Sequence, residues 1–183
     1  MIFRAVEDAD LIERTRKGDV ESYNLLISRW EKRVYNYLLR ILGNRLGCRE
    51  DALDLSQDVF LKAYQNIRKL EDPSRFGPWL FRIAHNEAYS LFRKRKPEDE
   101  LTGIETPHDQ AYPVELRLAA SVALQTLSPE QREAVVLKIY QGFKLEEMAQ
   151  ILECPVSTIK SRLYTALELL KDQLAPVRTR GVG

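Results

Sequence analysis

Residues 145–163 most constrain the fold of this 183-residue chain, because they are typical of two short helices joined by a tight turn. In the first half, LEEMAQIL, apolar side chains recur with the i, i+3, i+4, i+7 spacing of one buried helix face. Pro155 follows at the first turn of the next helix, where its missing N–H costs nothing. We therefore predict a helical hairpin whose second helix begins at Val156 and extends to about residue 171.

The outward face of this second helix is polar and basic. Serine and threonine hydroxyls with lysine and arginine between them suit a DNA groove, since they can contact phosphates and base edges. The candidate DNA-contacting residues are Ser157, Thr158, Lys160, Ser161, Arg162 and Tyr164. The hairpin is therefore either a DNA-binding helix-turn-helix or a plain helical hairpin with a solvated outer face.

Composition excludes several classes of protein. No apolar run approaches the roughly 20 residues that span a bilayer, and residues 1–10 lack the features of a signal peptide. We therefore expect a cytoplasmic protein with no membrane insertion. Cys48 and Cys154 stand alone, which predicts neither a disulfide nor a zinc site. In the absence of a phosphate-binding loop, metal-ligand spacing or catalytic constellation, we predict no cofactor, no metal and no enzymatic activity.

Helical periodicity also runs through the N-terminal half. It predicts one helix between Asp19 and Gly43 and another from about residue 50 to residue 69. One side of the latter is apolar, whereas its other side carries a mixed stripe of Asp54, Gln57, Asp58 and Leu61. This stripe is either solvated or a surface for a partner.

The next helix carries an unusual face. Asp72 as cap and Pro73 in the first turn predict that it opens there, and it should extend to about residue 94. At successive steps of four or three it presents Arg75, Trp79, Arg82, Asn86, Tyr89 and Arg93. Aromatic rings can stack on unpaired bases while arginines hold the phosphates, which favours single-stranded DNA. Alternatively, the two aromatic residues lie at the edge of the core and the arginines are solvated. His85 is interpreted as a polar residue on this basic helix.

The charge distribution separates two parts of the chain. Residues 73–96 contain six basic residues and one acid, whereas residues 97–115 contain six acids and neither lysine nor arginine. Three prolines and the acids make residues 97–113 a predicted flexible linker. We therefore predict an all-α fold with domains at 1–96 and 114–183. In the second domain, Ser128 and Gln131 form a predicted capping box that starts a helix.

Three segments together resemble the extracytoplasmic-function (ECF) class of bacterial RNA polymerase sigma factors. Residues 54–63, DLSQDVFLKA, are similar to the segment that docks on the coiled coil of the polymerase β′ subunit. Residues 76–86, FGPWLFRIAHN, are similar to the promoter-melting helix, and residues 127–163 look like the domain that binds the minus-thirty-five element. The resemblance covers about residues 10–174 in the order and spacing of the family.

This resemblance implies a sigma factor that binds core RNA polymerase, at the β′ coiled coil and the β flap, and directs promoter-specific initiation. Promoter DNA and an anti-sigma factor are the further partners it implies. The implied polymerase-binding residues are Asp54, Gln57, Asp58, Phe60 and Leu61. The six-residue face from Arg75 to Arg93 would recognise and melt the minus-ten element, and residues 66–72 would form a pocket for a flipped-out base.

Two positions depart from the family pattern. Glu153 stands in the turn where relatives usually have glycine, so this residue has either a positive φ or a slightly different turn. Leu53 stands where an acid is frequent, so the docking surface should be less acidic. The competing interpretation is a stand-alone helix-turn-helix repressor or activator, which predicts no role for the stripe on residues 54–61.

Overall fold

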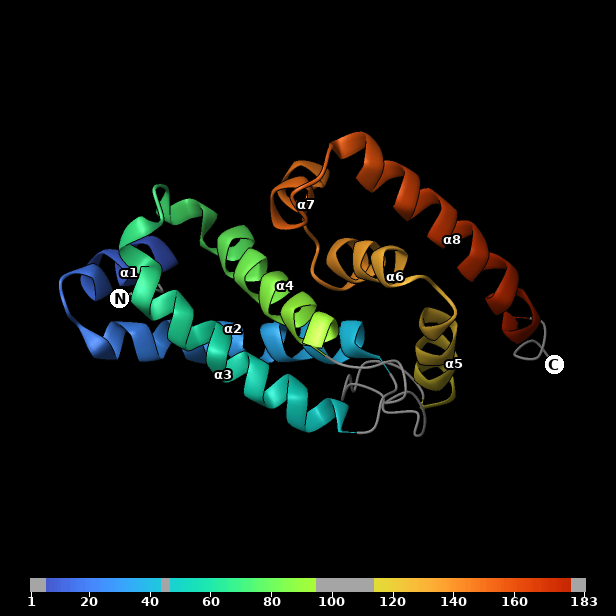
Figure 1. The fold of residues 1–183 in the computed structure, drawn as a ribbon, viewed down its shortest axis with the longest axis horizontal. Helices are drawn as coiled ribbons and strands as arrows, with labels where there is room; N and C mark the ends of the chain where they lie inside the picture. Colours follow the sequence, from blue (N-terminus) through green and yellow to red (C-terminus); the bar gives the residue numbers. More distant parts are fainter. Residues whose placement is uncertain (1–5, 44–46, 95–113, 179–183) are drawn as a thin grey trace, which may run out of the picture.

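The computed structural model describes residues 6–43, 47–94 and 114–178, and every element of regular structure in these ranges is helical (Figure 1). The predicted all-α fold is therefore confirmed, whereas the predicted linker lies outside the described residues. The α-helices are α1 (Asp8–Arg16), α2 (Val20–Leu42), α3 (Cys48–Asn66), α4 (Phe76–Lys94), α5 (Val114–Gln125), α6 (Pro129–Val135), α7 (Leu145–Ile151) and α8 (Val156–Arg178). The short elements are the 3₁₀ turns η1 (Ile67–Lys69) and η2 (Pro73–Arg75) and the π-helical turn η4 (Val136–Tyr140).

Helices α1 to α4 form the N-terminal part, in which α3 and α4 pack against α2 and against each other. Asp19 caps the start of α2, where its side chain accepts a hydrogen bond from the Ser22 amide. At the start of α4, Gly77 lets α4 and α2 approach closely, because a Cβ atom there would lie 2.7 Å from the ring of Trp30 in α2. These contacts fix the direction in which α4 leaves the core.

Helices α5 to α8 form the C-terminal part. The predicted capping box starts α6, since the Ser128 hydroxyl accepts from the Gln131 amide and the Gln131 side chain accepts from the Ser128 amide. Helices α7 and α8 form the predicted helix-turn-helix, and α8 is longer than expected. In its turn Glu153 has φ 50°, which decides between the two alternatives left open by the sequence. A non-glycine residue here adopts the left-handed conformation.

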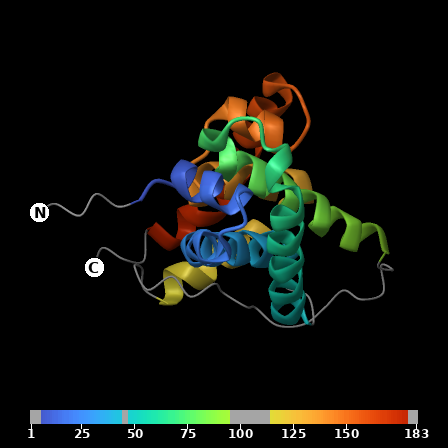
Figure 2. The ribbon, with the colours of Figure 1, turned by 90° about the vertical axis from the view of Figure 1, so that its left-hand side faces the viewer.

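One hydrophobic core cluster spans both parts, and a second cluster lies within the C-terminal part. Phe143, which follows η4, packs edge-on against Phe81 of α4 with ring centroids 4.9 Å apart. Met148 and Ile151 of α7 are fully buried in the same cluster as the side chains of α2 and α4. In Figure 2, α4 lies between α2 on one side and α7 on the other. The prediction of separate small domains did not anticipate this shared core.

The capping box at the start of α6 gives a prediction for stability. Ser128→Ala leaves the Gln131 amide without its acceptor, and we expect the free energy of unfolding to fall by about 1 kcal/mol. Urea unfolding followed by circular dichroism measures the change. The matched control is Ser28→Ala, at an exposed position within α2, where alanine should be neutral or slightly stabilising. Equal losses in the two variants would contradict the assigned role of the cap.

Candidate nucleic-acid and protein interfaces

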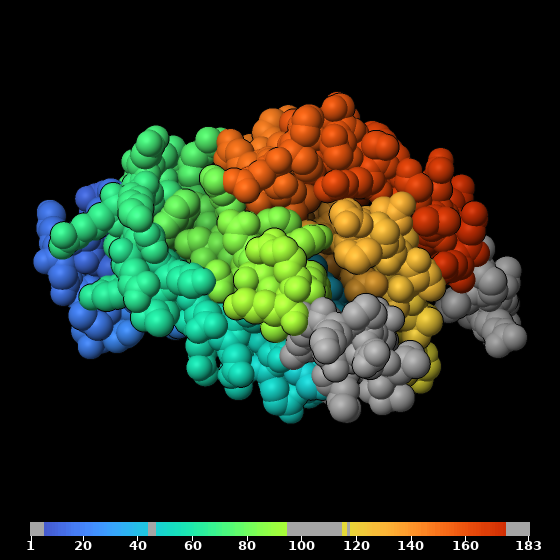
Figure 3. All heavy atoms as spheres, in the orientation of Figure 1, coloured from blue at the N-terminus to red at the C-terminus, as the bar shows by residue number. Residues whose placement is uncertain are grey.

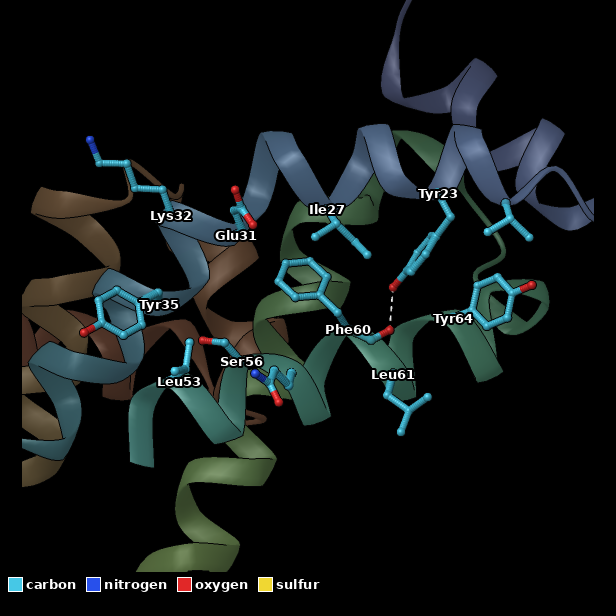
Figure 4. A pocket seen from close by; sticks show the side chains of 12 residues that line it. Tyr23, Ile27, Glu31, Lys32, Tyr35, Leu53, Ser56, Phe60, Leu61 and Tyr64 are labelled. Atoms are coloured by element: carbon cyan, nitrogen blue, oxygen red, sulfur yellow. Dashed lines mark hydrogen bonds between the residues drawn. The ribbon is translucent and has the colours of Figure 1, made fainter. Parts of the chain in front are cut away.

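A groove of about 820 Å³ runs between α2 and α3, and its walls are mostly apolar (Figure 4). Helix α3 contributes Gln57, Phe60 and Leu61, three of the five residues predicted to bind a partner. The other two, Asp54 and Asp58, are exposed on the same helix but do not line the groove. The complete lining consists of Val20, Tyr23, Ile27, Glu31, Lys32, Tyr35, Leu53, Ser56, Gln57, Phe60, Leu61 and Tyr64.

The α2 wall of this groove was missed from the sequence, because the periodicity of α2 assigned Tyr23 and Ile27 to the core. The Tyr23 hydroxyl donates a hydrogen bond to the backbone carbonyl of Phe60, and burial raises the pKa of that phenol. The ring of Tyr23 also packs 5.0 Å from that of Tyr64. The floor is therefore held firmly while Leu61 on the rim is 56% exposed. An apolar rim of this kind fits an amphipathic protein segment.

A second, smaller hollow of about 300 Å³ lies where α3, η1 and α4 meet. It brings Trp79 and Asn86, two residues of the predicted single-strand-binding face, beside Asn66 and Lys69 of the predicted base pocket. The remaining lining residues are Lys62, Ile83 and Glu87. An indole ring, two amide side chains and two amines can together stack on a planar base, bond its edge and hold its phosphate.

The start of α4 beside this hollow is fixed by the predicted cap. The Asp72 carboxylate accepts hydrogen bonds from the hydroxyl and the amide of Ser74, at 2.7 and 2.9 Å, and these bonds lower the pKa of Asp72. Pro73 stands in the first turn, as predicted, although this turn is the 3₁₀ element η2 and α4 itself begins at Phe76. Arg75 therefore precedes the helix that carries the other five residues of the face.

The predicted face on α4 has two edges with different surroundings. Trp79 and Asn86 form the edge that lines the hollow beside α3. On the other edge Arg82 forms an ion pair with Glu153 in the helix-turn-helix, and the half-buried Tyr89 lies 4.4 Å from the His85 ring. Arg93 is exposed near the end of the helix. Helical spacing predicted one continuous face, whereas in the structure one edge lines the hollow and the other contacts the helix-turn-helix.

His85 has a structural role that the sequence did not reveal. Its Nδ1 atom lies 2.8 Å from the Glu133 carboxylate of α6, and the Tyr37 hydroxyl of α2 donates to the same oxygen. Burial and the Glu133 charge raise the pKa of Tyr37 well above its ordinary value, so this phenol remains a donor. One buried carboxylate therefore joins three helices from both parts of the chain.

The outward face of α8 is open. Ser157, Lys160 and Ser161 are exposed, and Tyr164 is 64% exposed. The other two predicted DNA-contacting residues, Thr158 and Arg162, are partly buried, and Arg162 Nη1 lies 3.9 Å from the Cys154 sulfur. Beneath them Ile159, Leu163 and Ala166 are buried. The hydroxyl and ammonium groups are thus free to meet an anionic surface.

None of the described helices is long and apolar enough to cross a membrane. No group of three or more histidine, cysteine or acidic residues within the described ranges could hold a metal ion.

The two parts of the chain each match a family model. Residues 26–98 match sigma-70 region 2 and residues 117–170 match sigma-70 region 4. The chain is 30% identical to the ECF RNA polymerase sigma-E factor of Haemophilus influenzae, over 93% of this chain and 96% of the relative. It is also 30% identical to the sigma-E factor of Escherichia coli, over 94% and 97%, and 28% identical to the sigma-H factor of Pseudomonas aeruginosa, over 93% and 95%.

Two solved structures resemble the whole fold. One is the sigma factor RpoE in complex with the anti-sigma factor NepR from Bartonella quintana, with TM-score 0.74, 28% identity, and coverage of 85% of this chain and 98% of that chain. The other is CnrH in complex with the cytosolic domain of CnrY, with TM-score 0.69, 26% identity, and coverage of 92% and 97%. With both regions matched and relatives aligned over nearly the whole length, the chain belongs to the extracytoplasmic-function class of RNA polymerase sigma factors.

Proposed function

We propose that this sigma factor divides promoter recognition and polymerase binding among three surfaces. The groove between α2 and α3 takes core RNA polymerase. The hollow beside α4 takes an unpaired base of the minus-ten element, and the outward face of α8 takes the duplex of the minus-thirty-five element. Sigma factors direct transcription initiation and have no catalysis of their own, so all three surfaces serve binding. The protein would work in the cytoplasm, where it meets polymerase and DNA.

The observation that carries this proposal is the hollow beside α4. Its lining joins Trp79 and Asn86 with two lysines from a separate helix and turn, Lys62 and Lys69. A base that leaves the duplex loses stacking worth a few kcal/mol, and an aromatic ring with an amide beside it can return that energy. The Lys62 ammonium pairs with Glu87 at 2.5 Å, which keeps a carboxylate beside the hollow as an acceptor for an exocyclic amine.

The groove between α2 and α3 supports docking of a helical partner segment. Its exposed rim leucines, Leu53 and Leu61, offer apolar area. Asp54 and Asp58 stand beside it and favour a partner with basic residues. This fits the β′ coiled coil of core polymerase, with the β flap as a second contact for the C-terminal part. A stand-alone repressor would leave this groove unexplained.

An anti-sigma factor is a further proposed partner. One of the similar solved structures is a sigma factor bound to an anti-sigma factor, and another is CnrH bound to the cytosolic domain of CnrY.

Polymerase docking is tested by Leu61→Asp. A charge on the groove rim should weaken binding to core polymerase by at least about tenfold, because a buried leucine contributes roughly 1.5–3 kcal/mol. Co-elution of the labelled variant with purified core enzyme measures the affinity. Leu25→Asp is the matched control, since Leu25 is 52% exposed on α2 but does not line the groove.

Sequencing of transcripts made with core enzyme, genomic DNA and the wild-type protein identifies the promoters. A protein that binds duplex DNA and directs no initiation would favour the repressor interpretation.

Strand opening is tested by Trp79→Ala. Loss of the indole should weaken open-complex formation by roughly 1–3 kcal/mol while binding to the upstream duplex is retained. Permanganate reactivity of minus-ten thymines reports the opening. Asn86→Ala provides a second variant that keeps the packing of Trp79 against Phe76, whose ring lies 6.0 Å away. Unchanged thymine reactivity in both variants would contradict the assignment of this hollow.

Upstream recognition is tested by comparing Lys160→Ala with Arg162→Ala. The exposed Lys160 should contact phosphate, so its loss should weaken binding on all sequences and lower the salt slope by about one. Loss of the Arg162 side chain should cost roughly 1–3 kcal/mol of binding free energy and relax the sequence preference if this residue reads a base. Anisotropy titrations on promoter duplexes at several salt concentrations separate the two roles. If both variants bind as the wild type does, α8 is not the recognition helix.

A further inference from the structure

The helix-turn-helix covers part of the face that α4 needs for DNA. The guanidinium of Arg82 is paired with the Glu153 carboxylate in the turn between α7 and α8. One turn earlier, the Gln150 amide oxygen, oriented toward Arg75, accepts from its guanidinium at 3.1 and 3.2 Å. Figure 3 shows the atoms of α7 abutting those of α4. Two of the three arginines predicted to hold phosphates, Arg75 and Arg82, are therefore occupied by acceptors from the same chain, whereas Arg93 is exposed.

The contacts that hold this arrangement lie deeper in the interface. Phe143 inserts between the two parts and packs on Phe81. Arg33 of α2 lies over the rings of Trp30 and Phe143, at 4.6 and 5.8 Å, and its Nη2 donates to the backbone carbonyl of Gln141 at 2.9 Å. The buried Glu133 carboxylate, bound by Tyr37 of α2 and His85 of α4, completes the interface. These buried contacts determine whether the two parts stay together.

The two kinds of contact differ in strength. The side chains of Arg82 and Glu153 are 50% and 53% exposed, so their pair is screened by water and salt and contributes little to stability. The position of the Arg82–Glu153 pair matters more than its energy, because the Glu153 carboxylate occupies the place on the guanidinium that a DNA phosphate would take. Glycine in this turn would accept the left-handed φ without strain, but it would leave Arg82 without this partner.

We propose that the free protein adopts a closed, self-masked state. Phe143, Arg33 and Glu133 hold the two parts together, and Glu153 occupies Arg82 in place of a phosphate. The outward face of α8 stays open in this state, so duplex contact at the upstream element can precede separation of the two parts. The second edge of the α4 face becomes available only after they separate. This inference rests on the proposed DNA-binding role of α4.

The closed state itself is tested without DNA. Small-angle X-ray scattering of the full wild-type chain should fit the closed arrangement, whereas Phe143→Ser and Arg33→Ala should each increase the radius of gyration. Arg33→Ala removes no buried apolar side chain, and circular dichroism verifies that both variants keep their helices. Ile139→Ser, at a 60% exposed position on η4, is the control and should scatter as the wild type does. An extended wild type, or variants with wild-type scattering, would overturn the closed state.

The masking is tested with a fluorescein-labelled, mixed-sequence single-stranded DNA of about 20 nucleotides. Phe143→Ser should bind it several-fold more tightly than the wild type. Glu153→Gln should bind about two- to fivefold more tightly, as expected for loss of an exposed ion pair. Glu146→Gln makes the same charge change at an exposed position of α7 and should leave the affinity nearly unchanged. Equal affinities of Glu153→Gln and Glu146→Gln would overturn the masking role of Glu153.

A double variant separates failure of this inference from failure of the proposed function. Adding Trp79→Ala to Phe143→Ser should lower the single-strand affinity of the opened protein if α4 holds the DNA. If scattering reports opening but Trp79→Ala has no effect on affinity, the DNA-binding role of α4 is wrong, and with it the masking. If Trp79→Ala weakens binding but Phe143→Ser changes neither scattering nor affinity, the proposed function stands and the closed state is rejected.

Discussion

The arrangement of this protein depends on a carboxylate buried where its two parts meet. A buried charge is tolerated only when hydrogen bonds replace its lost water, and Glu133 receives them from Tyr37 and His85. Because these two partners come from α2 and α4, the carboxylate sets the position of α6 against both. Helix α7 follows along the chain and comes to lie on α4. Removal of either partner would leave the charge under-bonded, so this interaction specifies one docking geometry.

Local features of the fold could be predicted from the sequence because they are determined by neighbouring residues. The capping box at Ser128, the cap at Asp72 and the helix-turn-helix were all predicted at the correct positions. At Glu153 two possibilities were open, a positive φ or a slightly different turn, and the structure has the positive φ. In each case the hydrogen bonds and steric limits involve residues only a few positions apart.

Long-range features could not be predicted in the same way. Helical periodicity assigned Tyr23 to an apolar face and made no assignment for Phe81, and it could not identify what would cover either side chain. Tyr23 forms the floor of an open groove, and Phe81 meets Phe143 from the other part of the chain. The same limit explains His85, since nothing near it in the sequence indicates a buried glutamate from α6. The roles of the groove and of the α4 face came from resemblance to a family, because spacing alone left both open.

Under the proposed function, one helix has two competing uses for its polar face. The apolar side of α4 is fixed in the core, which leaves its basic side to contact either the helix-turn-helix or DNA. The exposed pair between Arg82 and Glu153 weakens with salt, whereas the contacts of Phe143 and Glu133 are buried and are screened far less. Nucleic acid can thus displace the acid from the arginine at small cost, but separation of the two parts requires a larger driving force. Core polymerase can supply that force if it binds the two parts at separate sites, because only the open form can then satisfy both contacts.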